Sequence, residues 1–322
     1  MNFKILPIKG DASFREFYRQ TSNDKNKIIV VAQTNKYQNL IAYTAINKFL
    51  RKNGILAPKL YEYNFNKGII IIEDFGNKSF FKIITKKKNK FSEYKKIINL
   101  LIKIQKIKPK RKIKNVSKGF HNINKYNINH LHKESDLFFD WYLPFFFKKK
   151  EILIIKKKTN KILHKLYKKL NFSNTCFVHR DFHLQNLMKF RNKIGVIDNQ
   201  DALIGNPSYD LASLVDDVRV RSTNDLKNQI INYYLKKAPK NYKIKSKEFL
   251  EDFYILSVQR CLKIIGIFAR LYKRDKKKKY LKLIPNTWKI LDERLSSNIF
   301  FELRKTINIY VSNRIKKKII KK

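Results

Sequence analysis

Cysteine, glycine and proline are all scarce in this chain of 322 residues, and the shortage of cysteine excludes whole classes of protein. The two cysteines, Cys176 and Cys261, are too few for a disulfide framework or a structural zinc site. The sequence also lacks any apolar run near the roughly 18 residues that a membrane-spanning helix needs. Gly10 and Asp11 interrupt the first apolar segment too early for a secretory signal. We therefore expect a cytoplasmic protein in a reducing environment, with no membrane span.

Acidic residues are few as well, with 25 Asp and Glu against 73 Lys and Arg and a net charge of +48. Such a charge would attract phosphate backbones, so a non-catalytic nucleic-acid-binding protein is one interpretation. However, only 14 of the basic residues are Arg, whereas nucleic-acid interfaces favour the arginine fork. Lys, Asn, Ile, Phe and Tyr share AT-rich codons, so we attribute the charge to codon bias and expect no specific nucleic-acid partner.

Apolar residues are plentiful despite the charge. Hydrophobic residues make up 43% of the chain and aromatic residues 13%, which is too apolar for a disordered protein. This is enough material for one large packed core or two modest ones.

The first 76 residues show a pattern typical of strands around one helix. Apolar residues at helical spacing over Tyr37–Asn53, followed by Gly54, predict a helix with a glycine cap. Strands are expected at Phe3–Ile8, Phe17–Gln20, Lys27–Ala32, Lys59–Tyr63 and Gly68–Glu73.

After Gly76 the pattern becomes mainly helical. Helices are expected around Tyr94–Ile104, over 131–170 with a break near Pro144, and over Glu251–Tyr272, with a loop at 108–128. Short strands are expected at Cys176–Val178 and Ile194–Ile197. The fold class is therefore α+β, with a small antiparallel-sheet lobe over residues 1–76, a larger helical lobe over residues 77–322 and a hinge at Glu73–Gly76.

The segment with the most chemical information is His179-Arg180-Asp181, followed after four residues by Asn186 and then, twelve residues later, by Asp198 at the end of an apolar strand. This spacing is typical of phosphoryl-transfer sites. Asp181 can accept the proton of an attacking hydroxyl group. Asn186 and Asp198 offer the oxygen ligands that Mg²⁺ prefers.

Three histidines outside that pattern could be interpreted as metal ligands, namely His130, His132 and His183. Neither a cysteine nor a carboxylate lies at ligand spacing from them, so we interpret them as structural.

The segment around His179, Asp181 and Asn186, and the segment that ends at Asp198, resemble those of the aminoglycoside phosphotransferase-like kinases. These kinases have a bilobal protein-kinase-like fold. Within that family, the chain is most similar to the cell-wall sugar kinases that phosphorylate N-acetylmuramate and N-acetylglucosamine at the anomeric hydroxyl. The matching segments are Gly10–Arg15, Glu134–Leu143, His179–Met188, Val196–Ala202, Gly205, Tyr209–Leu214 and Gln259–Leu271.

The resemblance implies a kinase that uses ATP and Mg²⁺ and transfers the γ-phosphoryl group to a small-molecule substrate, an amino sugar. It implies that Asp181 is the catalytic base and that Asn186 and Asp198 hold the metal ion. Backbone groups of Glu73, Asp74 and Phe75 would meet adenine, and Gly10, Ser13 and Phe14 would cover the phosphates. The resemblance leaves the oligomeric state open.

The chain also departs from the wider kinase pattern. Most kinases place a lysine on the third strand, paired with a glutamate of the next helix. Here Ile28–Ala32 has no lysine and Tyr37–Asn53 has no acidic residue. The cation that holds the nucleotide phosphates is therefore not identified, and Arg15 and Lys36 are the candidates. Asn199 also stands where a phenylalanine is expected.

Acceptors of other kinases with the same fold stay open as alternatives: aminoglycosides, choline, homoserine or ketosamines. A cationic acceptor would need a pocket lined with carboxylates, and an anionic one would need a base such as Arg260 or Arg270. Few acids are clustered in the helical region beyond Glu134, Asp136, Asp140, Asp216 and Asp217, and a cationic acceptor stays open.

Overall fold

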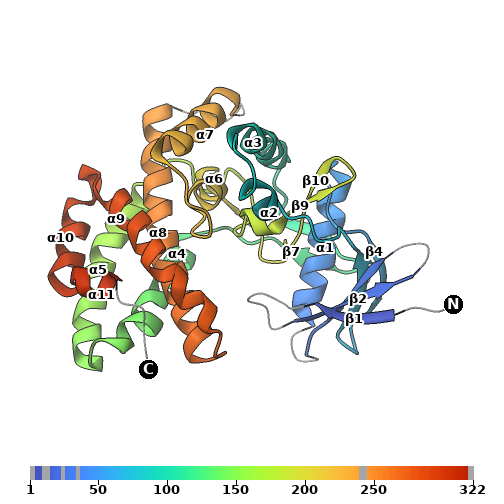
Figure 1. Cartoon of the computed structure of the whole chain (residues 1–322), viewed down its shortest axis with the longest axis horizontal. Helices are drawn as coiled ribbons and strands as arrows, with labels where there is room; N and C mark the ends of the chain where they lie inside the picture. Colours follow the sequence, from blue (N-terminus) through green and yellow to red (C-terminus); the bar gives the residue numbers. More distant parts are fainter. Residues whose placement is uncertain (1–3, 9–14, 23–25, 34–36, 239–244, 318–322) are drawn as a thin grey trace. The chain divides into compact units, whose positions relative to one another are not determined.

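The structure is a computed structural model that describes residues 4–8, 15–22, 26–33, 37–238 and 245–317 (Figure 1). The chain divides into two compact units. A sheet unit comprises Met1–Lys125, Cys176–Ile204 and Asn228–Pro239, and a helical unit comprises Tyr126–Thr175, Gly205–Lys227 and Lys240–Lys322. Gly76 lies inside the sheet unit, and the division into nucleotide-binding and acceptor-binding lobes at that residue stays a prediction.

A five-stranded antiparallel sheet forms the first part of the sheet unit. Its strand order is β1 (Lys4–Ile8), β2 (Glu16–Thr21), β3 (Lys27–Val31), β5 (Ile69–Glu73) and β4 (Leu60–Asn64). All four neighbouring pairs are antiparallel, so the predicted antiparallel sheet is confirmed.

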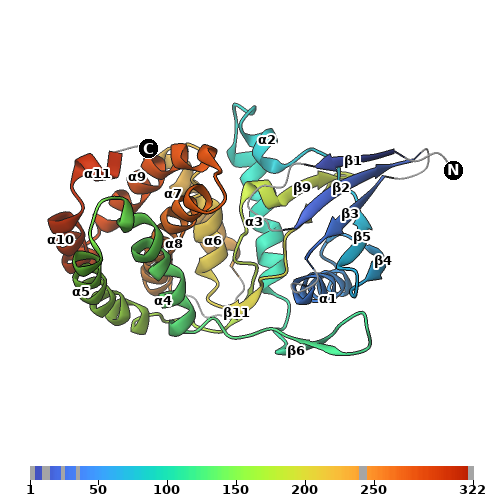
Figure 2. The same cartoon turned by 90° about the horizontal axis from the view of Figure 1, so that it is seen from below.

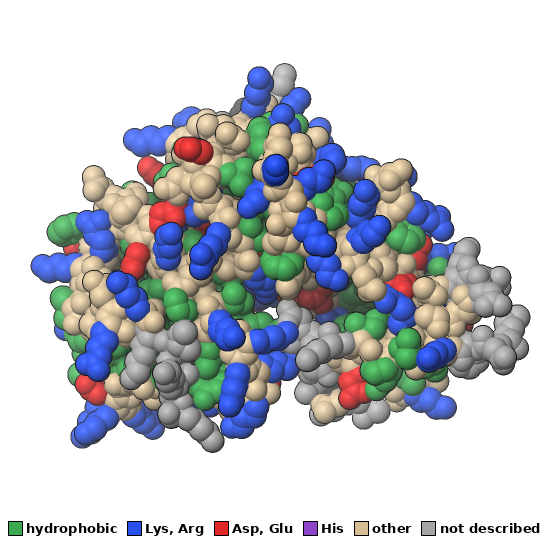
Figure 3. Space-filling model, viewed as in Figure 1, with side chains coloured by type: hydrophobic (Ala, Val, Ile, Leu, Met, Phe, Trp, Pro, Cys, Tyr) green, Lys and Arg blue, Asp and Glu red, His purple; other side chains and the backbone are tan. Residues whose placement is uncertain are grey.

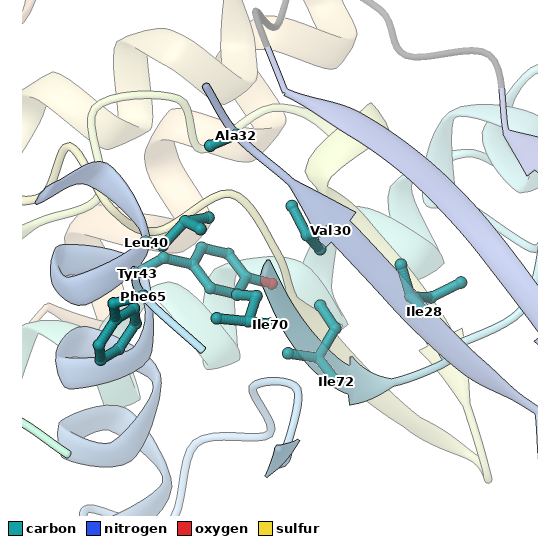
Figure 4. Close-up of a cluster of buried hydrophobic side chains, with 8 residues drawn as sticks. All are labelled: Ile28, Val30, Ala32, Leu40, Tyr43, Phe65, Ile70 and Ile72. Atoms are coloured by element: carbon teal, nitrogen blue, oxygen red, sulfur yellow. The ribbon is translucent and has the colours of Figure 1, made fainter. Parts of the chain in front are cut away.

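Helix α1 (Gln38–Lys52) packs against this sheet (Figure 4). Alternate residues of β3 and β5 are buried because side chains alternate between the two faces of a strand, and these residues meet the apolar stripe of α1. The shared core consists of Ile28, Val30, Ala32, Leu40, Tyr43, Phe65, Ile70 and Ile72. The expected helix and its glycine cap are confirmed, since Gly54 follows the last turn with φ +74°.

The rest of the sheet unit carries short elements that support the loops described below. They are α2 (Phe80–Ile84), α3 (Phe91–Gln105), β6 (Lys112–Lys114), β7 (Phe120–Asn122), β8 (Cys176–Val178), β9 (Leu187–Phe190), β10 (Lys193–Val196) and β11 (Leu203–Gly205). Hairpins pair β6 with β7 and β9 with β10. The expectation of a loop over 108–128 was wrong in part, because a three-residue antiparallel hairpin forms inside it.

The helical unit is built around α8 (Ser246–Lys273). Its other helices are α4 (Ile128–Leu137), α5 (Lys149–Lys168), α6 (Ser208–Val215), α9 (Ile284–Leu295), α10 (Phe301–Tyr310) and α11 (Asn313–Lys317), and α7 (Asn224–Lys237) belongs partly to each unit (Figure 2). A wide π-helical turn at 138–142 and a 3₁₀ turn containing Pro144 separate α4 from α5, so the expected break is confirmed. Within the described ranges, no helix combines the length and the apolarity that crossing a membrane requires.

Gly68 is a position where the fold requires a glycine. It has φ +65°, and a Cβ atom built there would lie 2.1 Å from the carbonyl oxygen of Ala32, which follows β3. This close approach permits the hydrogen bond from the Ala32 amide to the Gly68 carbonyl oxygen. The turn before β5 therefore keeps its register with β3 only when residue 68 has no side chain.

We predict that Gly68→Ala lowers the free energy of unfolding by about 2–4 kcal/mol, because it adds a steric overlap to the cost of a left-handed backbone. Gly76→Ala is the matched control. Gly76 has φ +75° with nothing within 4 Å of a built Cβ, so only the backbone cost of about 1 kcal/mol applies. Thermal unfolding of both variants checks the difference, and equal decreases in Tm would contradict it.

Candidate active site

The loop between β8 and β9 carries the first part of the site. Phe182 and Leu184 are fully buried, whereas Asp181 and Asn186 are half-buried. The apolar side chains thus anchor the loop and leave its polar side chains at the surface. Arg180 has φ +73°, a costly conformation for a residue with a side chain, and such strain is common in loops that present reactive groups.

His179 connects this loop to the segment that leads to Asp198. The imidazole is buried, and its Nδ1 accepts a hydrogen bond from the Asp181 amide at 3.2 Å. Its Nε2 lies 3.1 Å from the carbonyl oxygen of Ile197, which can only accept. The ring is therefore the Nε2–H tautomer, and one side chain fixes the backbone of both Asp181 and Ile197.

Asn186 lies between the same two segments. Its side-chain Nδ2 donates to the backbone carbonyl oxygen of Asp181 at 3.0 Å. The backbone carbonyl oxygen of Asn186 accepts a hydrogen bond from the Ile197 amide at 3.0 Å. Since Nδ2 faces an acceptor, Oδ1 is the side-chain atom suited to a cation. Asp181, Asn186 and the residue before Asp198 are thereby held in one hydrogen-bonded frame.

Asp198 occupies a strained position at the end of this frame, with φ +66°. Its Oδ1 accepts a hydrogen bond from Nη2 of Arg15 at 2.5 Å, and Nη1 of Arg15 donates to Oε1 of Gln200 at 3.2 Å. Asn199 is buried and donates from Nδ2 to Oδ1 of Asn47, on α1, at 2.8 Å. The segment after β10 is thus held by Arg15, just before β2, and by α1.

The residues that we predicted to meet adenine use their side chains within the sheet unit. The Asp74 carboxylate accepts from Nε of Arg19 at 2.5 Å and from the Gly76 amide at 2.7 Å, while Glu73 pairs with Arg51. Phe75 packs on Phe190, with ring centroids 4.8 Å apart, and fills the space where Gly195 has no side chain. The Glu73 amide also donates within this unit, to the carbonyl oxygen of Lys59 at 2.8 Å, and adenine binding by the backbone of the segment stays a prediction.

The predicted phosphate-binding residues Gly10, Ser13 and Phe14, together with Lys36, lie outside the described residues. Arg15 directly follows Phe14 in the chain and is described. Its contact with Asp198 was not foreseen, although its place at the end of the Gly10–Arg15 motif could have suggested it. A single sequence gives no signal for the Asn47–Asn199 pair, because the two residues lie 152 positions apart.

The donor set fits a magnesium ion. The described ranges contain no group of three or more His, Cys, Asp and Glu side chains able to hold a metal ion. Mg²⁺ does not require one, since it binds proteins through one or two carboxylates and completes its shell with water and substrate phosphates. Oδ1 of Asn186 and the Asp198 carboxylate are the groups that would hold it.

The five acids that the sequence analysis named as candidates for an acceptor pocket are each paired with a cation inside the helical unit. Glu134 pairs with Lys263, Asp136 and Asp140 with Lys156, Asp216 with Arg294 and Lys227, and Asp217 with Arg219. Burial alone would raise the pKa of Asp216, but the charge and hydrogen bonds of Arg294 and the charge of Lys227 outweigh it and hold the pKa below its ordinary value.

The fold defines the class of protein. Over 92% of this chain, an aminoglycoside phosphotransferase with ADP bound superposes with a TM-score of 0.60 at 13% identity, and the match covers 94% of that protein. Choline kinase of Streptococcus pneumoniae superposes over 91% of this chain and 94% of its own with a TM-score of 0.61 at 15% identity. The chain therefore has the kinase-like fold of these enzymes, as predicted.

A sequence profile of the phosphotransferase enzyme family matches residues 4–243, and the chain belongs to that family. It is 27% identical over 296 residues to the N-acetylmuramate/N-acetylglucosamine kinase of Pseudomonas aeruginosa, covering 90% of this chain and 83% of the relative. The enzyme of the same name from Neisseria meningitidis is also 27% identical, with coverage of 88% and 83%. The chain is a small-molecule kinase whose acceptor is a hydroxyl group.

We predict that Asn47 and Asn199 stabilise the site jointly. Asn47→Ala and Asn199→Ala should each lower the free energy of unfolding by about 1–3 kcal/mol, because each leaves a buried amide without its partner. The double variant should lose about 1 kcal/mol less than the sum of the single losses. Chemical denaturation of the three variants measures this coupling, and strictly additive losses would show that the hydrogen bond contributes nothing.

Proposed function

We propose that this enzyme transfers the γ-phosphoryl group of ATP, with Mg²⁺, to the anomeric hydroxyl of N-acetylmuramate and N-acetylglucosamine in cell-wall sugar recycling. The observation that carries the proposal is the similarity to kinases named for these two sugars, which extends over about nine-tenths of the chain. ATP as donor is supported by an aminoglycoside phosphotransferase of the same fold that was solved with streptomycin and ATP, at a TM-score of 0.58. Because cells keep ATP in the cytoplasm, we place the reaction there.

Asp181 is the proposed catalytic base. Its backbone is fixed by His179 and by Asn186, so its half-buried carboxylate has a defined position from which to accept the proton of the sugar hydroxyl. Orientation of this kind accounts for much of the rate of phosphoryl transfer, since the protein does little covalent chemistry. When bound, Mg²⁺ supplies positive charge that neutralises the phosphate oxygens, and Asn186 and Asp198 are the residues to hold it.

Nucleotide binding is assigned to the sheet unit. We propose that the backbone of Glu73, Asp74 and Phe75 meets adenine, and that the turn containing Gly10, Ser13 and Phe14 covers the phosphates. The packing of Phe75 against Gly195 and Phe190 supports this assignment, because it holds the backbone of the segment in place.

The charges of the helical unit favour a neutral or anionic acceptor over a cationic one. A cationic acceptor such as choline or an aminoglycoside needs carboxylates that are available to it, and the five candidate acids are already paired with Lys or Arg. Arg260, which lies over the ring of Tyr209 at 4.8 Å, and the half-buried Arg270 are basic residues suited to the carboxylate of N-acetylmuramate.

The basic surface requires no nucleic-acid partner. Figure 3 shows Lys and Arg side chains scattered over the visible face among polar and apolar ones. Dispersed lysines of this kind give weak, salt-sensitive attraction to any polyanion, which does not amount to specific recognition.

We predict that the purified protein consumes ATP with N-acetylmuramate and N-acetylglucosamine and not with choline, homoserine or aminoglycosides. Asp181→Asn should lower kcat by roughly 10²–10⁴, because the amide cannot accept the hydroxyl proton. Asp225→Asn, an exposed residue in the first turn of α7, is the control of equal charge change. Turnover with choline, homoserine or an aminoglycoside and with neither sugar would reject the sugar proposal. Full activity of Asp181→Asn would reject Asp181 as the catalytic base.

A further inference from the structure

The kinase pattern requires a cation for the nucleotide phosphates, and β3 does not supply one at the usual place. The single lysine of β3, Lys27, is its first residue and lies 3.7 Å from Glu62 and 5.3 Å from the Tyr61 ring, both on β4. Helix α1 contains no acidic residue to pair with a strand lysine. The cation must therefore come from another element.

Arg15 is a buried cation that contacts the predicted metal-binding carboxylate. It directly precedes β2, and its side chain is 5% exposed. Its guanidinium bonds Asp198 at 2.5 Å and Gln200 at 3.2 Å, so it contacts both ends of the segment 198–200.

Aromatic rings fix the guanidinium in this position. Its central carbon lies 5.5 Å from the centroid of Phe17 and 5.7 Å from that of Tyr43. Burial raises the pKa of Tyr43 to about 12, so the ring is a neutral phenol whose face can receive a cation. A buried guanidinium is costly unless it is paired, and this one is paired and stacked, unlike the loosely held ion pairs of protein surfaces.

Helix α1 contacts the segment 198–200 through a hydrogen bond between two side-chain amides, where most kinases have a lysine–glutamate ion pair. Asn47 is 3% exposed, and its bond to Asn199 joins α1 to the residue that follows Asp198. Tyr43 lies one turn earlier on α1, against Arg15. The helix therefore contacts both the cation and the segment that the cation holds.

We propose that Arg15 is the cation that binds the phosphates of the nucleotide, and that it also neutralises Asp198 so that divalent metal binds there weakly unless nucleotide is present. This inference rests on the proposed function and adds a residue to it. The guanidinium has five N–H donors in a planar fork, so it can bond a carboxylate and a phosphate oxygen at once. It differs from a strand lysine, which meets phosphate as a point charge.

The test is the affinity for ADP in the presence of a chelator, compared between wild type, Arg15→Ala and Arg15→Lys. Exposed Arg111, which belongs to the same unit, gives the control variant Arg111→Ala with an equal loss of charge. We expect Arg15→Ala to weaken ADP binding roughly 10- to 100-fold, as removal of hydrogen bonds to a charged group does. Arg15→Lys should weaken it by about tenfold, because the fork is lost, and Arg111→Ala should have no effect.

A second measurement uses Mn²⁺ alone, without nucleotide, followed by electron paramagnetic resonance. The wild type should bind Mn²⁺ weakly at this site because Arg15 already neutralises Asp198, and Arg15→Ala should bind it about tenfold more tightly. Asp198→Asn in the Arg15→Ala background should remove the gain.

The outcomes separate the two proposals. If the wild type binds ADP and folded Arg15→Ala binds it equally well, the role of Arg15 is overturned and the proposed function stands. If Arg15→Ala does not fold, the role of Arg15 is likewise overturned when Arg15→Lys binds both ADP and Mn²⁺ as the wild type does. A wild-type protein that binds no ADP, with or without Mn²⁺, would overturn the proposed function as well.

Discussion

The geometry of the site depends on the two hydrogen bonds of the His179 imidazole. One ring nitrogen fixes the amide of Asp181 and the other fixes the carbonyl oxygen of Ile197, so two segments 18 residues apart share one rigid support. Asn186 adds a second connection between the same segments. Because the frame is made of an imidazole, an amide side chain and backbone groups, it can position the carboxylates of Asp181 and Asp198 without consuming their charge.

Around this frame the chain uses different contacts from those of the general kinase pattern. The link between helix α1 and the active site is an amide pair, Asn47 with Asn199, and the buried cation directly precedes β2. An amide pair carries no net charge, so it avoids the large desolvation cost of a buried ion pair. The departure from the expected phenylalanine at position 199 thus has a structural reason, since only a polar residue can bond Asn47.

Local patterns in the sequence predict most of the fold. The apolar β-branched runs of β3 and β5, the apolar stripe of α1 and the break at Pro144 all lie within one element and its neighbours, where residue pattern and turn residues determine the structure. The β6–β7 hairpin was missed because its strands have only three residues each, which is too short to establish a period of two.

The spacing of His179, Asp181, Asn186 and Asp198 likewise indicates a phosphoryl-transfer site, because chain order alone defines the motif. The contacts of Arg15, Asn47 and the Asp74–Arg19 pair are different. They join residues 55 to 185 positions apart, and such contacts depend on tertiary packing that no local pattern records.

The excess of basic over acidic residues affects how the protein behaves in solution. With 73 Lys and Arg against 25 Asp and Glu, the molecule carries a strong field of one sign, and the ion pairs inside the helical unit leave that net charge unchanged. This field draws nucleotides and acidic sugars toward the protein at low ionic strength, and it also makes the folded chain repel itself. Added salt therefore slows the encounter with anionic substrates and relieves the repulsion within the fold.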